Sequence, residues 1–245
     1  MPVSESAGGG LFSVVVAVRT RLHCMQLCAI TDRRSLSNPT GPEARPSEAA
    51  LCHRLLALAE GWFAGGVQFV QLREKDLDAA ELQSLAREMM ARIARNRSKL
   101  LINIPTPAAA SLAVAAAADG VHLAGKPAPG AAAGVRQAFR ACGRDAIVSV
   151  PCHSLEDIDL ARKEQVDMIL FSPVFEKLAT PPQVFQPHGL EALRQACAAA
   201  QGIPVFALGG VTTANASACL GVGAAGVAGI RLFTTDGWRR LKTSP

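Results

Sequence analysis

Eight short, largely apolar runs recur along the chain, and segments with helical periodicity separate most of them. Such runs fit parallel strands that are buried on both faces, because helices cover both sides of a parallel sheet. Eight strand–helix units within 245 residues favour a single (β/α)8 TIM barrel of the α/β class over an open doubly wound sheet. The expected strands are Gln26–Thr31, Val67–Leu72, Lys99–Ile104, Gly120–Leu123, Ala146–Val150, Val166–Phe171, Pro204–Leu208 and Ala224–Ile230.

The barrel is expected to occupy residues 25–236 as one domain, because no shift in composition divides this range. Residues 1–24 are rich in Gly and Ser and then irregular, and Met25 directly precedes an ordinary opening strand. We therefore interpret residues 1–24 as an irregular N-terminal tail outside the fold, or as the product of a mis-chosen start codon. Residues 237–245 are expected to form a C-terminal tail.

The composition narrows the class of function. Lys and Arg outnumber Asp and Glu by 25 to 20, but they are scattered and not interleaved with aromatic residues, so no nucleic-acid partner is expected. No apolar run reaches the roughly 18–20 residues that span a membrane, so no membrane partner is expected either. The seven cysteines are spread singly without metal-binding spacing, which indicates buried thiols in a reducing compartment. We expect a cytoplasmic protein without a metal site.

The segment Ile203–Val211 joins a buried strand to the pair Gly209 and Gly210, and residues that can cap a helix follow it. A strand, a glycine pair and a helix N-terminus leave backbone N–H groups that can bind an anion such as phosphate. The next expected strand repeats the pattern, with Gly229 near its end. Loops after the last two strands commonly form the phosphate site of such barrels, so we predict one here. The alternative is that the glycines serve only tight turns and close packing.

Polar side chains also stand at the end of the second expected strand. Gln71, Arg73 and Lys75 share one face by alternation. Two cations and an amide at a barrel mouth suit a phosphate or a carboxylate. A solvated turn is the alternative interpretation of the same residues.

His153 follows the fifth expected strand, where an imidazole can donate or accept a proton near neutral pH. A hydrogen-bonded structural role is the alternative. A nucleophilic pair with Cys152 is disfavoured, because adjacent residues on extended backbone usually diverge.

His122, within a strand, is expected in the core or in support of the site. The proline-containing loop Glu176–His188 is either a lid or an insertion without function.

A set of ordered segments resembles the thiamine phosphate synthase/thiazole tautomerase (TenI-like) family from about Met25 to Phe233. Each segment alone is common, whereas the ordered set is specific. The resemblance implies a (β/α)8 barrel of thiamine biosynthesis that holds a small-molecule thiazole phosphate at the loops after strands seven and eight. The segments are Ala29–Asp32, Gln71–Leu77, Leu101–Asn103, Ala118–Leu123, Cys152–Asp157, Ser172–Phe175, His188–Leu193, Pro204–Val211 and Gly226–Ile230.

The resemblance also implies particular site residues. At the phosphate site, Arg231 replaces a residue that is usually small, and it either adds a cationic contact or points outward. The backbone positions implied for phosphate binding are Gly209, Gly210, Gly229, Ile230 and Arg231. The positions implied for other substrate contacts are Gln71, Arg73, Lys75, Asn103, Ser149 and Gly189.

Two activities within the resembled family differ in their requirements. The synthase couples a pyrimidine pyrophosphate to the thiazole phosphate and uses Mg²⁺, whose carboxylate ligands would follow the third and fourth strands. Ile104 and the segment Ala124–Pro127 stand at those places, and their side chains offer no oxygen ligand. The pyrophosphate clamp of the synthase is also absent in register, where Glu176–Thr180 stands instead.

The tautomerase of this family needs no metal, and its proton-transfer histidine corresponds to His153. We therefore expect a metal-independent thiazole tautomerase-like isomerase that uses no cofactor, with His153 as the catalytic acid and base. The alternatives are a Mg²⁺-dependent thiamine phosphate synthase and a catalytically silent barrel that binds a phosphate ligand. The sequence leaves open whether the chain forms a homodimer.

Overall fold

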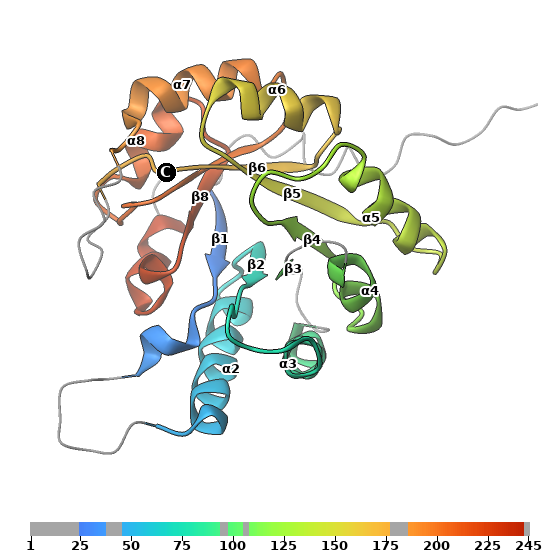
Figure 1. The fold of residues 1–245 in the computed structure, drawn as a ribbon. Coiled ribbons are helices and arrows are strands. Elements are labelled where there is room, and N and C mark those ends of the chain that lie inside the picture. Colours follow the sequence, from blue (N-terminus) through green and yellow to red (C-terminus); the bar gives the residue numbers. More distant parts are fainter. Residues whose placement is uncertain (1–24, 38–45, 94–97, 105–107, 177–185, 243–245) are drawn as a thin grey trace, which may run out of the picture.

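The computed structural model describes residues 25–37, 46–93, 98–104, 108–176 and 186–242. Eight parallel strands form a closed barrel in the order of the sequence, with β1 paired to both β2 and β8. Helices surround the strands on the outside (Figure 1). This arrangement confirms the single (β/α)8 barrel. None of the described helices combines the length and the apolar character needed to cross a membrane.

The observed strands follow the expected ones closely, with small shifts at their ends. The strands are β1 (Gln26–Ile30), β2 (Phe69–Leu72), β3 (Lys99–Ile104), β4 (Gly120–Leu123), β5 (Ile147–Cys152), β6 (Met168–Phe171), β7 (Val205–Leu208) and β8 (Gly226–Gly229). The α-helices are α2 (Glu48–Ala64), α3 (Ala79–Ile93), α4 (Ala108–Ala115), α5 (Ala131–Arg140), α6 (Leu155–Lys163), α7 (Gly189–Ala199) and α8 (Ala216–Gly221). The 3-10 helices are η1 (Arg33–Leu36), η2 (Arg231–Phe233) and η3 (Asp236–Lys242).

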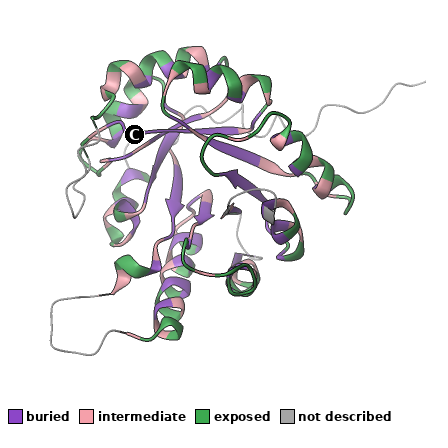
Figure 2. Ribbon diagram, in the orientation of Figure 1, coloured by how far each residue is buried: buried purple, intermediate pink, exposed green. Residues whose placement is uncertain are grey.

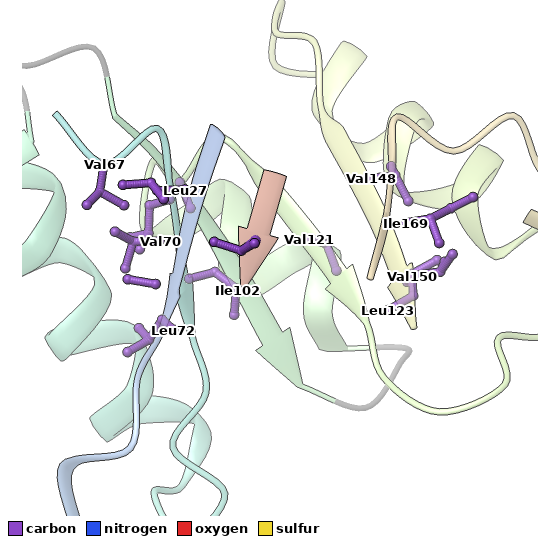
Figure 3. Packing of buried hydrophobic residues seen from close by; sticks show 14 of the residues in the cluster. Leu27, Val67, Val70, Leu72, Ile102, Val121, Leu123, Val148, Val150 and Ile169 are labelled. Carbon is purple, nitrogen blue, oxygen red and sulfur yellow. The ribbon is translucent and has the colours of Figure 1, made fainter. Parts of the chain in front are cut away.

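Alternation along the strands builds two apolar layers. Outward side chains such as Val70, Ile102 and Val148 pack between strands and helices (Figure 3). Inward side chains fill the barrel, where the Phe69 and Phe206 rings meet edge to face with centroids 5.7 Å apart. The strands are buried on both sides, whereas the helices expose their outer faces (Figure 2). Burial of each such side chain contributes about 1.5–3 kcal/mol, so these two layers hold the barrel together.

A repeated polar contact closes the seams at the N-terminal ends of the strands. Gln68, just before β2, accepts a hydrogen bond from the Leu27 N–H at 2.8 Å. Asp119, just before β4, accepts from the Leu100 N–H at 3.0 Å. Asp167, just before β6, accepts from Val148 N–H at 2.8 Å. These residues therefore serve the fold at the end of the barrel opposite the C-terminal ends of the strands.

The C-terminal segment departs from the expected tail. Within η3, the side chains of Trp238 and Leu241 are buried, and the Trp238 ring lies 5.9 Å from the Phe233 ring. The Trp62 indole N–H donates to the Phe233 carbonyl at 2.9 Å. The segments η2 and η3 follow β8 and pack beside α2. They bury apolar side chains at this contact. Residues 1–24 and 243–245 lie outside the described residues.

Three of the six described cysteines are buried, as expected for small apolar side chains, and Cys52 and Cys197 are partly exposed. Cys28, Cys152 and Cys219 are buried and reduced. Cys142 departs from the expectation, because it lies exposed in the turn after α5.

Candidate active site

His153 stands at the junction between β5 and α6. The Ser154 hydroxyl accepts from the Asp157 N–H at 3.2 Å, which makes Ser154 the N-cap of α6. The Asp157 carboxylate in turn accepts from the His153 N–H at 2.9 Å. These contacts satisfy one N–H group of the first turn of α6 and the N–H of His153 just before the cap, so the backbone that carries His153 is fixed. The His153 side chain itself is exposed.

One hydrogen bond determines the tautomer of His153. Its Nδ1 lies 2.6 Å from the carbonyl oxygen of Ser172, just after β6. A carbonyl can only accept, so Nδ1 must carry the proton. In the neutral ring the second nitrogen, Nε2, is then unprotonated and can accept a proton from a substrate. Fixing one ring nitrogen in this way prepares the other for acid–base chemistry.

The segment after β6 also contacts the glycine pair that follows β7. The Val174 N–H donates to the Leu208 carbonyl at 2.9 Å, and the Phe175 N–H donates to the Gly209 carbonyl at 3.0 Å. The same short segment therefore holds the His153 ring through Ser172 and the predicted phosphate loop through Phe175.

Gly210 is required by conformation and by packing. Gly209 and Gly210 have φ of +91° and +64°, a region that favours glycine. A Cβ on Gly210 would stand 2.4 Å from the Glu176 carbonyl oxygen and 2.7 Å from the Phe175 Cβ. The Asn215 amide donates to the Gly210 carbonyl at 3.1 Å and fixes the loop from the other side. The alternative of tight turns and close packing therefore applies to Gly210, and its phosphate role stays a prediction.

The other predicted phosphate residues lie at the end of the neighbouring strand. Gly229 ends β8, which pairs with β7, so the two predicted loops are adjacent. The first hydrogen bond of η2 runs from the Phe233 N–H to the Ile230 carbonyl, after the N–H groups of Arg231 and Leu232. The Arg231 side chain is exposed and forms no ion pair within the described part of the chain.

Polar side chains line the inner face of the barrel next to this site. Asn103, His122 and Ser149 are neighbours across β3, β4 and β5 in the strand register. His122 Nδ1 lies 2.8 Å from the Ser149 hydroxyl. On β2, the Oε1 of Gln71 is buried and has no hydrogen-bond partner among the described residues. A buried acceptor without a partner is costly, so Gln71 is a candidate to receive a hydrogen bond from a ligand.

Burial and a nearby charge determine the protonation state of His122. Burial, together with the positive charge of Arg73, lowers the pKa of His122 to about 3. His122 is therefore neutral at physiological pH, which fits the core or supporting role expected for it.

Burial raises the pKa of the Cys152 thiol to about 12, and Cys152 packs in the outer layer between strands and helices. A nucleophilic pair of Cys152 and His153 is thus disfavoured by geometry and charge.

The remaining predicted residues are less closely associated. Lys75 is exposed, and Arg73 is partly buried. The Gly189 N–H donates to the Val174 carbonyl at 3.0 Å, so this amide serves to close the loop rather than to meet a substrate. Most of the loop Glu176–His188 lies outside the described residues, and the prediction that it is a lid concerns this part of the chain.

The residues at the expected magnesium positions do not fit that ion. Strand β3 ends at Ile104, and Ala124–Pro127 follows β4, so neither place supplies a carboxylate. Mg²⁺ prefers oxygen ligands, usually carboxylates together with substrate phosphates. Among the described residues, no three His, Cys, Asp or Glu side chains gather in a way that could hold a metal.

Comparisons with known proteins agree with this fold. The family model described as thiamine monophosphate synthase matches residues 46–233. The chain belongs to the thiamine phosphate synthase/TenI-like family. This membership confirms the resemblance and places the protein among the enzymes of thiamine biosynthesis.

Named relatives give the same family. A putative thiamine-phosphate synthase of Geobacter sulfurreducens is 41% identical over 184 residues, which cover 74% of this chain and 80% of the relative. Putative thiamine-phosphate synthase 2 of Aquifex aeolicus is 39% identical over 168 residues, 69% of this chain and 83% of the relative. The solved thiamine phosphate pyrophosphorylase of Pyrococcus furiosus shares the fold, with a TM-score of 0.63, 24% identity, and coverage of 89% of this chain and 92% of the other.

Proposed function

We propose that the protein binds a thiazole phosphate at the ends of β7 and β8 and catalyses a metal-independent proton transfer on its ring. The observation that carries this proposal is the segment after β6. It bonds His153 through the Ser172 carbonyl and bonds the predicted phosphate loop through Phe175. A group for proton transfer and an anchor for the substrate are thus held in a fixed relation, which is the main requirement of general acid–base catalysis.

The chain's own residues account for the steps of a tautomerisation. Backbone N–H groups near Gly210 and Ile230 hold the phosphate and so orient the ring. The unprotonated Nε2 of His153 accepts a proton from a ring carbon, and the Ser172 carbonyl stabilises the imidazolium through Nδ1–H. His153 then returns the proton at another ring position, which leaves an aromatic thiazole. No proton is gained or lost overall, so neither a metal nor a second substrate is needed.

Thiamine-phosphate synthase is the second candidate, and the names of the relatives favour it over the tautomerase. Two features at the barrel mouth also suit it. Gln71 offers an unpartnered buried acceptor, and Arg73 adds positive charge beside His122. The missing carboxylates at Ile104 and Ala124–Pro127 speak against the magnesium ion that this reaction uses. A silent barrel that only binds the phosphate ligand is the third possibility.

One set of assays separates these candidates. The purified full-length protein is incubated with the thiazole phosphate tautomer, or with hydroxymethylpyrimidine pyrophosphate and aromatic thiazole phosphate, each with a chelator and with added Mg²⁺. The proposal expects conversion of the tautomer at the same rate in both conditions. Coupling that stops with chelator and returns with Mg²⁺ would establish the synthase instead. Binding without turnover in every condition would establish the silent barrel.

A further inference from the structure

The sequence Arg73-Glu74-Lys75-Asp76 carries two positive and two negative charges, so it is neutral by composition. The structure separates the two signs. The Glu74 side chain is buried and that of Asp76 is 27% exposed, and both form ion pairs. Arg73 and Lys75 form no ion pair within the described ranges, and Lys75 is exposed. Within the described residues, the stretch therefore has both of its anions in ion pairs and neither of its cations.

Arg33 of η1 binds both carboxylates, although its side chain is only 1% exposed. Its Nη1 and Nη2 donate to the two oxygens of Asp76 at 2.7 Å each, and Nη1 donates to Glu74 at 3.1 Å. The backbone N–H of Arg33 donates to both Glu74 oxygens at 3.2 and 3.1 Å. Glu48 accepts from Nη2 at 2.6 Å, and the exposed Arg34 donates to Asp76 from the other side at 2.7 Å. Such a bidentate fork fixes carboxylates more firmly than single contacts do.

We propose that Arg33 is a positioning residue that keeps the Glu74 and Asp76 carboxylates away from Arg73 and Lys75, so that the barrel mouth presents positive charge to an anionic substrate. This inference rests on the second candidate function, which the positive charge of Arg73 at the barrel mouth suits. Unheld carboxylates on the same loop would compete with the substrate anion for Arg73 and Lys75. Arg73 already acts as a charge in this region, since it contributes to the lowered pKa of His122.

A second contact fixes the same loop. The Thr31 hydroxyl, at the end of β1, accepts from the Arg73 N–H at 2.9 Å. The loop after β1 therefore holds the backbone of Arg73 through Thr31 and the neighbouring carboxylates through Arg33. Substitution of Arg33 should alter the charge at the mouth while this backbone contact remains.

Binding of inorganic pyrophosphate, measured by calorimetry on the full chain, tests the inference. Arg33→Gln should weaken binding tenfold or more, and the double variant Arg33→Gln/Asp76→Asn should recover parent affinity within about threefold. A purely structural role for Arg33 would not give this rescue. Arg92→Gln is the matched control, because it removes one positive charge from a partly exposed ion pair with Glu60 and should leave binding unchanged. If Arg33→Gln does not fold, Arg33→Lys should show a smaller loss that Asp76→Asn also rescues.

The outcomes distinguish this inference from the anion site of the second candidate function. If Arg73→Gln weakens pyrophosphate binding but Arg33→Gln does not, the role of Arg33 is refuted and the anion site stands. A loss in Arg33→Gln that Asp76→Asn fails to rescue also refutes it. If Arg73→Gln leaves binding unchanged, the anion site itself is wrong, and the inference falls with it.

Discussion

Replacement of Gly210 by alanine should destabilise the fold strongly, whether or not phosphate binds there. The new Cβ would stand 2.4 Å from the Glu176 carbonyl oxygen and 2.7 Å from the Phe175 Cβ, so the segment after β6 must move. The φ of +64° adds backbone strain for any residue with a Cβ. Loss of phosphate binding in a Gly210 variant is therefore ambiguous, because the same change displaces the segment that holds His153.

The magnitude follows from the two effects. Left-handed backbone costs a non-glycine residue about 1–2 kcal/mol, and overpacking costs about 1–3 kcal/mol. We expect Gly210→Ala to lower the free energy of unfolding by about 2–5 kcal/mol. For a chain of this size, that loss corresponds to a fall in melting temperature of about 4–20 °C. Thermal and denaturant unfolding of the purified variant, followed by circular dichroism, measure it.

Gly143 provides the matched control. Its φ is +68°, close to that of Gly210, but a Cβ there meets nothing within 4 Å. Gly143→Ala should therefore cost only the backbone strain, about 1–2 kcal/mol. Equal losses of stability in the two variants would show that the contact with Phe175 and Glu176 does not matter, and would refute the packing argument.

Other substitutions test the C-terminal segment, the loop after β7 and the cluster around Arg33. Trp238→Ala should cost about 3–5 kcal/mol of unfolding free energy, and a loss below 1 kcal/mol would show that η3 is a dispensable tail. Asn215→Ala removes hydrogen bonds to Thr212 and Gly210 and should cost about 1–3 kcal/mol in denaturant unfolding. The hydrogen bond from Arg33 lowers the pKa of Asp76 to about 2, below its unfolded value of 3.8. The Asp76 carboxylate thus stabilises the fold above about pH 4, and this stabilisation is lost as the pH falls toward 2. Asp76→Asn should cost about 1–2 kcal/mol at pH 7, after allowing for solvent screening, and progressively less in acid; a loss independent of pH would contradict this.

The fold was predictable because local patterns and tertiary structure agree along most of the chain. Helix α3, for example, carries apolar side chains at helical spacing, and these side chains are buried against the barrel. Strand β5 shows where local reasoning stops. It was expected to end at Val150, before Pro151, but pairing with β6 extends it to Cys152. That pairing is a property of two strands together, so the sequence around Pro151 cannot reveal it.

The C-terminal helix η3 was missed for a related reason. Its sequence is rich in basic residues, which is typical of a solvated tail, yet Trp238 and Leu241 are buried. Lys242 donates to the Gly65 carbonyl at 2.6 Å, so even a charged residue of this segment contacts α2. The need to cover the barrel beyond β8 decides the structure here, and local charge does not.

The candidate site was predictable in outline, because parallel strands bring their C-terminal ends to one edge. His153, the Gly209–Gly210 pair and the inward Gln71 follow from that rule. The Ser172 carbonyl and the buried Arg33 do not, since a backbone acceptor and an arginine in a polar loop carry no distinctive pattern. The packing need of Gly210 was foreseen only as an alternative, because contact with the segment after β6 requires the folded structure.

The most direct test of the proposed function is a measurement on His153→Gln and His153→Ala. The thiazole phosphate tautomer is the substrate, and kcat, the Kd for thiazole phosphate and the melting temperature are determined on the same preparations. Because the His153 side chain is exposed and its backbone is fixed by Asp157, both variants should fold normally and bind within a few-fold of the parent. We predict that kcat falls by about 10²–10⁴-fold, the usual contribution of a positioned acid–base group. Turnover that survives in either variant, or a lower melting temperature with unchanged turnover per folded molecule, would show that His153 is not the catalyst.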